Sequence, residues 1–164
     1  MKTLILNEKQ IEQKLKRIAF EIVEQNFEEE ALYLIGIDGN GKLIAEHLAE
    51  LLSKITDQKV ETAVLKINKK KPLEDTIEIS ISGETFKNGT VILVDDVLNS
   101  GKTMQYALGE LLKQPLKKIK TVALVDRKHR RYPIRCDYVG LTLSTTLQDR
   151  IDVVFSPQAK AFLV

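Results

Sequence analysis

The stretch from Val91 to Thr103 holds the residue types best suited to chemistry, and it reads VILVDDVLNSGKT. Four apolar residues run directly into Asp95 and Asp96, which is typical of a buried strand that ends at a polar rim. A short loop containing Gly101 follows, and a helix is predicted from near Thr103 to about Lys113, where Pro115 blocks its continuation. Backbone N–H groups of such a loop, together with the positive end of the helix dipole, form a site for an anion.

The two carboxylates lie beside this predicted anion site. Asp95 and Asp96 can accept hydrogen bonds from vicinal hydroxyls or help to hold a Mg²⁺ ion. The hydroxyls of Ser100 and Thr103 and the ammonium of Lys102 add donors for a phosphate. A compound that carries a phosphate next to a diol is a ribose 5-phosphate, so the stretch predicts binding of that class of compound.

Two other phosphate-binding or signalling motifs are excluded by spacing. Gly101-Lys102-Thr103 is how a Walker A motif ends, but Asp96 stands five residues before Gly101, where that motif needs glycine. The acidic pair of a receiver domain would follow the first strand, whereas this pair lies past mid-chain. An acidic helix entry with a chance glycine remains as the alternative, and the match over thirteen consecutive positions disfavours it.

Composition limits the class of protein. The length of 164 residues predicts one domain, residues 1–164. The single cysteine excludes an intrachain disulfide framework and a cysteine metal cluster. No early segment looks like a secretion signal, and no apolar run reaches membrane-spanning length. We therefore expect a soluble cytoplasmic protein that does not associate with a membrane.

Positive charge is concentrated in one part of the chain. The segment 113–135 carries nine Lys or Arg residues against one acid, a net +8, while the net charge of the whole chain is +2. The rest of the chain is therefore acidic. Such a concentration favours an anionic partner, although a solvated loop is an equally good interpretation of its irregular part, 127–135.

A second glycine-rich loop follows the apolar run 31–37. It reads Gly36-Ile37-Asp38-Gly39-Asn40-Gly41, and a helix rich in Leu, Ile and Ala follows to about Lys54. Three glycines in six residues allow a ligand to approach the backbone closely. The spacing does not fit a dinucleotide-binding fingerprint, and a tight turn without a ligand is the alternative.

The remaining elements alternate between helix and strand. Asn7 can cap a helix in which Ile11, Leu15, Ile18 and Ile22 recur at helical spacing. Strands are predicted over 60–67, 77–81, 119–125, 138–140 and 152–155. The lysine-rich segment 68–76 has no periodicity and is predicted to be a mobile loop. The alternation predicts a parallel α/β sheet with a ligand at the carboxyl ends of its strands.

Val91 to Thr103 resembles the phosphoribosyl-pyrophosphate (PRPP) signature of the type I phosphoribosyltransferases. The segment from Leu124 to Gly140 is similar to the corresponding stretch of the PyrR family, and so is the segment from Ile5 to Asn26. Members of that family are uracil phosphoribosyltransferases that also regulate pyrimidine operons by binding RNA. The resemblance covers nearly the whole chain and is weakest over 66–88 and after Leu141.

The resemblance implies an α/β fold of the type I phosphoribosyltransferase kind, in which helices flank a central parallel sheet and a small hood covers the base. The implied reaction is displacement of pyrophosphate from PRPP by a nucleobase, with uracil as the first base to expect and Mg²⁺ as the cofactor. Asp95 and Asp96 would be catalytic and would hold Mg²⁺ indirectly, through PRPP and water. The lysine-rich loop 68–76 would close over the site.

The resemblance also assigns residues to each part of the substrates. The 5-phosphate would be bound by Leu98, Asn99, Ser100, Gly101, Lys102 and Thr103. The pyrophosphate would be bound by Ile37, Asp38, Gly39, Asn40 and Gly41. The base would be bound by Asp126, Arg127, Val139 and Gly140. Purine-specific relatives have an aspartate where this chain has Asn99, and an amide cannot take up a proton at neutral pH, so purine acid–base chemistry is not expected.

Three positions depart from the family pattern. Asn40 replaces a usual arginine, Phe20 replaces a usual histidine of PyrR proteins, and Leu141-Thr142 replaces Lys-Asn. The first change predicts weakened activity. The alternative function is therefore a PyrR-like regulator that binds RNA or senses nucleotides with little or no turnover.

RNA contacts would come from the basic segment. Lys128, Arg130 and Arg131 are the candidates, with weak binding expected. We also expect a homodimer or a higher homo-oligomer.

Overall fold

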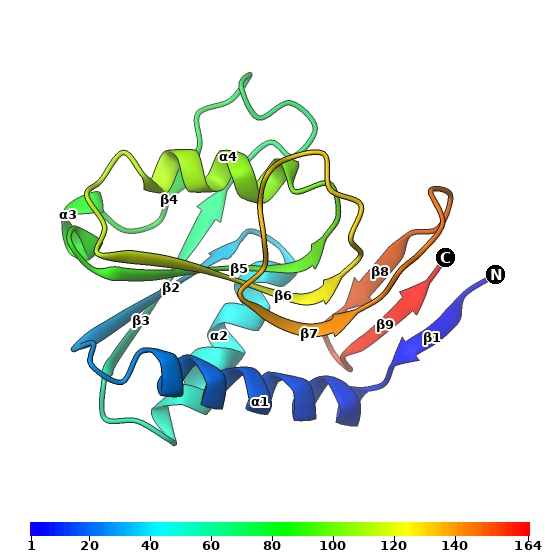
Figure 1. Ribbon diagram of the computed structural model, residues 1–164, viewed down its shortest axis with the longest axis horizontal. Helices are drawn as coiled ribbons and strands as arrows, with labels where there is room; N and C mark the ends of the chain where they lie inside the picture. Colours follow the sequence, from blue (N-terminus) through cyan, green and yellow to red (C-terminus); the bar gives the residue numbers. More distant parts are fainter.

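A computed structural model describes all residues from Met1 to Val164 (Figure 1). The larger of its two sheets has the strand order β4-β3-β2-β5-β6-β7, and all pairings are parallel except that of β4 with β3. Its strands are β2 (Ala31–Ile37), β3 (Lys59–Lys66), β4 (Glu78–Ile79), β5 (Thr90–Leu98), β6 (Lys118–Asp126) and β7 (Tyr138–Thr142). The predicted α/β architecture with a central parallel sheet is confirmed.

Helices cover both faces of this sheet. α1 (Glu8–Gln25) and α2 (Asn40–Ser53) pack on one face, and α4 (Lys102–Leu111) with the short α3 (Gly83–Phe86) packs on the other (Figure 1). Ile92 and Val94 of β5 face the first pair of helices, while Val91 and Leu93 face the second pair. Because both faces of β5 are buried, its run from Val91 to Val94 is apolar at every position rather than alternating.

The start of α1 follows from its sequence. The Asn7 side chain accepts a hydrogen bond from the Gln10 N–H at 2.9 Å, and the Gln10 side chain accepts one from the Asn7 N–H at 2.9 Å. This capping box satisfies two N–H groups that the helix leaves unpaired. None of the helices, α1 included, is both long enough and apolar enough to cross a membrane.

The hood is a separate antiparallel sheet made from both ends of the chain. Its strands are β1 (Thr3–Leu6), β9 (Lys160–Leu163) and β8 (Ile151–Val154), in that order. The two termini therefore lie side by side in Figure 1. The expected hood is present, although only the region of β8 was predicted to be a strand, and β1 and β9 were missed.

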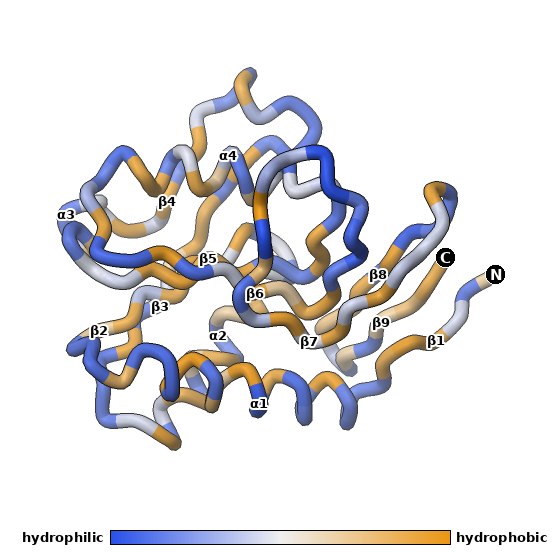
Figure 2. Tube along the Cα trace, viewed as in Figure 1, coloured by the Kyte–Doolittle hydropathy of each residue, from blue (hydrophilic) through white to orange (hydrophobic).

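Two predicted elements are shorter than expected. The strand expected over 77–81 is shortened to Glu78–Ile79. At the next residue the Ser80 N–H still donates to the Val64 carbonyl at 2.9 Å, but the Val64 N–H donates to the side-chain oxygen of Ser80, also at 2.9 Å, which ends the regular ladder. The helix expected to reach Lys113 ends at Leu111. In Figure 2 the central strands are largely apolar, and the loop from β6 to β7 is strongly hydrophilic.

Candidate active site

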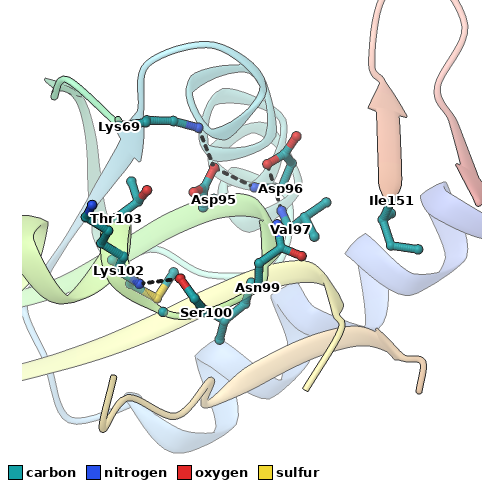
Figure 3. A pocket seen from close by; sticks show the side chains of 12 residues that line it. Lys69, Asp95, Asp96, Val97, Asn99, Ser100, Lys102, Thr103 and Ile151 are labelled. Carbon is teal, nitrogen blue, oxygen red and sulfur yellow. Dashed lines mark hydrogen bonds and ion pairs between the residues drawn. The ribbon is translucent and has the colours of Figure 1, made fainter. Parts of the chain in front are cut away.

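A hollow of about 190 Å³ lies at the carboxyl end of β5 (Figure 3). It is lined by the acidic pair, Asp95 and Asp96, together with the whole predicted 5-phosphate-binding segment from Leu98 to Thr103, which we call the phosphate loop. The lining residues are Lys69, Asp95, Asp96, Val97, Leu98, Asn99, Ser100, Gly101, Lys102, Thr103, Met104 and Ile151. Ile151 belongs to the hood, on the other side of the hollow from the phosphate loop (Figure 3). Its part in the hollow was not foreseen, because a lone Ile on a short strand carries no functional signal.

The phosphate loop has the shape that anion binding requires. Gly101 adopts a left-handed φ of +86° and caps α4, so the first turn of that helix opens toward the loop. The Ser100 hydroxyl accepts the Lys102 N–H at 3.3 Å. The Ser100 carbonyl accepts the N–H groups of Arg131 and Tyr132 at 2.8 and 3.0 Å. The loop from β6 to β7 therefore supports the phosphate loop from behind.

The acidic pair is strongly coupled to its surroundings. Asp95 is 5% exposed, and its Oδ1 accepts the N–H of Asp96 at 2.8 Å. Burial, and then the negative charge of Asp96, raise the pKa of Asp95 to about 7. The ammonium of Lys69 lies 3.8 Å from the Asp95 carboxylate and opposes this rise (Figure 3). One partly exposed lysine cannot balance the negative charge of two carboxylates, so a second cation would be stabilised beside them.

The donor set fits Mg²⁺. Carboxylate oxygens are the ligands this ion prefers, and the buried carboxylate of Asp95 has an ion pair with Lys69 alone, at 3.8 Å. No group of three or more His, Cys, Asp or Glu side chains is arranged so that it could hold a metal ion. Two carboxylates suit an ion that takes its other ligands from phosphate and water, as Mg²⁺ usually does.

The second glycine-rich loop approaches the acidic pair through close packing. A side chain on Gly41 would place its Cβ 2.6 Å from the Val94 carbonyl oxygen and 3.2 Å from the Asp95 Cα. A Cβ on Gly36 would lie 2.5 Å from the Gly41 carbonyl oxygen. Two of the three glycines thus let α2 begin against β5. Helix-to-strand packing accounts for these glycines, and the loop also borders the site.

Replacement of Gly41 by alanine should destabilise the protein by about 1–3 kcal/mol, because the added methyl group overlaps the backbone of β5. Urea unfolding of the two proteins measures the difference. Gly109→Ala is the matched control, since a Cβ there meets nothing within 4 Å and alanine favours the α4 helix by about 1 kcal/mol. Equal stability of the Gly41 variant and the parent would contradict the packing role.

The predicted base-binding residues are engaged elsewhere. Asp126 Oδ1 accepts the Lys128 N–H at 2.9 Å and Arg130 Nη2 at 2.8 Å. The carbonyl oxygens of Val139 and Gly140 accept Arg17 Nη2 at 3.0 and 2.9 Å. None of these residues lines the hollow, so the structure does not bring them together with the acidic pair.

Arg127 joins the phosphate loop to the chain that leads into the hood. Its Nε donates to the Thr145 hydroxyl at 2.7 Å, and its Nη2 donates to the Thr146 carbonyl at 2.9 Å. Its Nη1 lies 3.4 Å from Asn99 Oδ1. Of the predicted base-binding residues, Arg127 is therefore the one whose side chain forms a hydrogen bond with a side chain of the hollow.

Comparisons with known proteins agree with this geometry. Residues 2–160 match the family described as Phosphoribosyl transferase domain. The chain is 36% identical to Bifunctional protein PyrR of Clostridium novyi, with 94% of this chain and 91% of that protein covered. It is 37% identical to Bifunctional protein PyrR of Bacillus cereus, with 93% and 89% covered.

Solved structures show the same fold. The hypoxanthine phosphoribosyltransferase of Trypanosoma cruzi superposes with a TM-score of 0.77 at 16% identity, over 97% of this chain and 95% of that one. A hypoxanthine phosphoribosyltransferase of Staphylococcus aureus gives a TM-score of 0.73 at 18% identity, over 88% and 80% of the two chains. Such low identities establish likeness of fold alone.

Proposed function

Because the chain belongs to the phosphoribosyltransferase family, we propose that it is an enzyme that transfers ribose 5-phosphate from PRPP to a nucleobase and releases pyrophosphate. One observation carries the proposal: a helix-capped phosphate loop and a buried acidic pair line the same hollow. The loop is suited to the 5-phosphate, and the carboxylates are suited to the ribose hydroxyls. The cytoplasmic location, the single domain and the homo-oligomer remain predictions.

The residues of the hollow have distinct roles in this reaction. The bond between C1 and pyrophosphate breaks ahead of the new bond from a base nitrogen to C1, so positive charge develops on the ribose ring. The proton of that nitrogen passes to the departing pyrophosphate or to water. The carboxylates of Asp95 and Asp96 would face that charge and stabilise it. The amides from Leu98 to Thr103 would hold the 5-phosphate. Mg²⁺, when bound, would neutralise charge on the leaving pyrophosphate.

Pyrophosphate would lie between the glycine-rich loop and the lysine-rich loop. The ammonium of Lys69 is beside Asp95, and that of Lys102 donates to the Lys70 carbonyl at 3.3 Å. These contacts bring the lysine-rich loop to the edge of the hollow. Amides of Ile37 to Gly41, with Lys69, would thus supply donors to the leaving group.

We assign uracil as the base. The similarity to PyrR proteins supports this choice, and so does Asn99, whose amide cannot serve as the base that a purine reaction uses there. The base would lie near Arg127, between the phosphate loop and the hood. Val139 and Gly140 lie in β7, and Arg17 donates hydrogen bonds to their carbonyl oxygens. These two residues would form the wall of the base site on the β7 side.

The test is an incubation of the protein with PRPP, Mg²⁺ and a panel of pyrimidine and purine bases, followed by mass spectrometry of the nucleotides. We expect uridine monophosphate to form. If a different nucleotide forms, uracil is the wrong base but the assignment as a phosphoribosyltransferase stands. If no base gives a nucleotide, the result favours the regulatory alternative.

A regulator that binds RNA is the second candidate, because of the positive charge of segment 113–135. The side chains of Lys128 and Arg131 are exposed there and free of recorded ion pairs. Arg130 is different, because it donates to Asp126, to the Asn99 carbonyl at 2.8 Å and to the Ile134 carbonyl at 3.0 Å. Arg130 therefore holds the loop together rather than facing a partner.

RNA binding should be weak, salt-dependent and largely indifferent to sequence, because phosphate contacts need only charge. Lys128→Ala with Arg131→Ala should reduce the slope of log affinity against log salt by about 1.5, which corresponds to two lost phosphate contacts. A filter-binding titration of a hairpin and a scrambled RNA at several salt concentrations measures this slope.

The control for that experiment removes equal charge elsewhere, at the exposed Lys9 and Lys54. It should leave the slope unchanged. Tight binding that selects the hairpin and persists at high salt would contradict the prediction, because it would require contacts to bases.

A further inference from the structure

A single side-chain amide connects the acidic pair to the hood. Asn40 Nδ2 donates to Asp96 Oδ2 at 2.9 Å and to the Val153 carbonyl oxygen at 2.8 Å. Asp96 is a half-buried residue of β5, directly after the buried Asp95, and Val153 lies in the hood strand β8. The two acceptors are 57 residues apart in the sequence, and Asn40 comes from a third element, α2.

We propose that Asn40 is a positioning residue that couples the seating of the hood to the orientation of the Asp96 carboxylate. Both amide hydrogens are used, one for each acceptor, so neither contact can be lost without freeing one side of the link. The role goes beyond the pyrophosphate contact expected at this position. Its meaning for catalysis rests on the proposed function, whereas the link itself does not.

The backbone of Asn40 is held in a fixed position. Asn40 is the first residue of α2, and Gly41 packs that helix end directly on β5 near Asp95. The side chain is short, so little rotamer freedom is lost when it forms two bonds. A hydrogen bond to a charged carboxylate is also stronger than one between neutral groups.

Apolar packing holds the hood, since Leu6, Ile151 and Ala161 belong to the main core, and the bond from Asn40 adds a directed polar contact. β8 carries both Val153, which Asn40 holds, and Ile151, which lines the hollow. Any shift of β8 therefore changes the distance between Ile151 and the acidic pair. In the proposed reaction, the base would enter beneath the hood and the ribose would contact Asp96. Asn40 would transmit the position of one to the other.

Hydrogen exchange of the free protein tests the link without any substrate. Asn40→Ala should lower the protection of the β8 and β9 amides by up to about tenfold, because the hydrogen bond from Asn40 to the Val153 carbonyl is lost. Asn40→Asp should do the same, since a carboxylate cannot donate and repels Asp96. The matched control is Glu46→Ala, at an exposed position further along α2, which should leave protection unchanged. Unchanged protection in both Asn40 variants would overturn the proposal.

The other end of the link gives a reciprocal test. Asp96→Ala should loosen the hood, because Asn40 loses its partner. Asp96→Asn keeps one accepting oxygen, which can serve Asn40 only if the bond from the Val97 N–H is given up, so this variant should loosen the hood less than Asp96→Ala does. Asp95→Asn should also leave the hood protected, since Asp95 has no bond to Asn40. A hood that responds equally to all three changes would show a general loss of structure and overturn a specific link.

Kinetics then tests the role in the reaction. Asn40→Ala should raise KM for the base about tenfold through the loosened hood, with a separate fall in kcat from a less firmly held Asp96. An unchanged KM for the base would overturn the catalytic part of the proposal. If the parent protein forms no nucleotide at all, the proposed function fails, but the exchange experiments still decide whether Asn40 couples Asp96 to the hood.

Discussion

Replacement of both Asp95 and Asp96 by asparagine is expected to lower PRPP-dependent nucleotide formation by about 10³-fold or more. Asparagine keeps the shape of aspartate and still offers one oxygen to ribose hydroxyls. It has no charge to stabilise the positive ribose ring of the transition state, and it attracts Mg²⁺ weakly. The loss should therefore fall mainly on kcat rather than on the binding of the 5-phosphate by the loop from Leu98 to Thr103.

Rates of nucleotide formation, with thermal melting of both proteins, measure this effect and show that the variant is folded. Asp57→Asn provides the control for the removal of an acidic group, because Asp57 is exposed in the turn before β3, at the other end of the strands. Its activity should equal that of the parent. Full turnover in the double variant would remove the acidic pair from the mechanism and, with it, the assignment of the hollow.

Local sequence determines the part of the site that could be predicted. The four apolar residues from Val91 to Val94 predict a strand buried on both faces, and the two aspartates that follow predict that this strand ends at a polar edge. Gly101 had to end the loop where a positive φ is needed. Since a strand, a loop and a helix that follow one another in the chain are adjacent in space, the predicted phosphate loop and acidic pair do line one hollow.

Contacts between distant segments determine the part that could not. β1 and β9 are four-residue strands that pair only because the two ends of the chain meet. The bonds from Arg17 to Val139 and Gly140 span more than a hundred residues, and those from Asn40 reach Asp96 and Val153. No periodicity or spacing reveals such partners in advance.

The basic segment shows the same limit. Its charge could be counted, but sequence could not separate the arginine that is used internally from those that face solvent. Arg130 bonds to two backbone carbonyls and to Asp126, whereas Arg131 is exposed. Adjacent residues of an irregular loop can differ in this way, one bonded within the loop and the next exposed, because no regular period fixes the direction of each side chain.

The single change Asp95→Asn should make the protein more stable at high pH while it impairs activity. Burial raises the pKa of Asp95 from its ordinary 3.8 to about 7, with Asp96 adding to the rise. The folded protein thus holds this proton more tightly than the unfolded chain does. The stability that this group contributes is fully present below about pH 4 and is lost as the pH rises through 7.

The size of the effect follows from the shift. About three pKa units correspond to as much as about 4 kcal/mol, so the free energy of unfolding of Asp95→Asn should exceed that of the parent by up to that amount at pH 8. Near pH 4 the two proteins should be equal, because Asp95 is then protonated and resembles asparagine. Urea unfolding at a series of pH values measures the difference, and Asp57→Asn should show no such dependence. If the difference in free energy of unfolding stays constant from pH 4 to pH 8, the prediction is wrong, because Asp95 would then carry no buried charge in the folded protein.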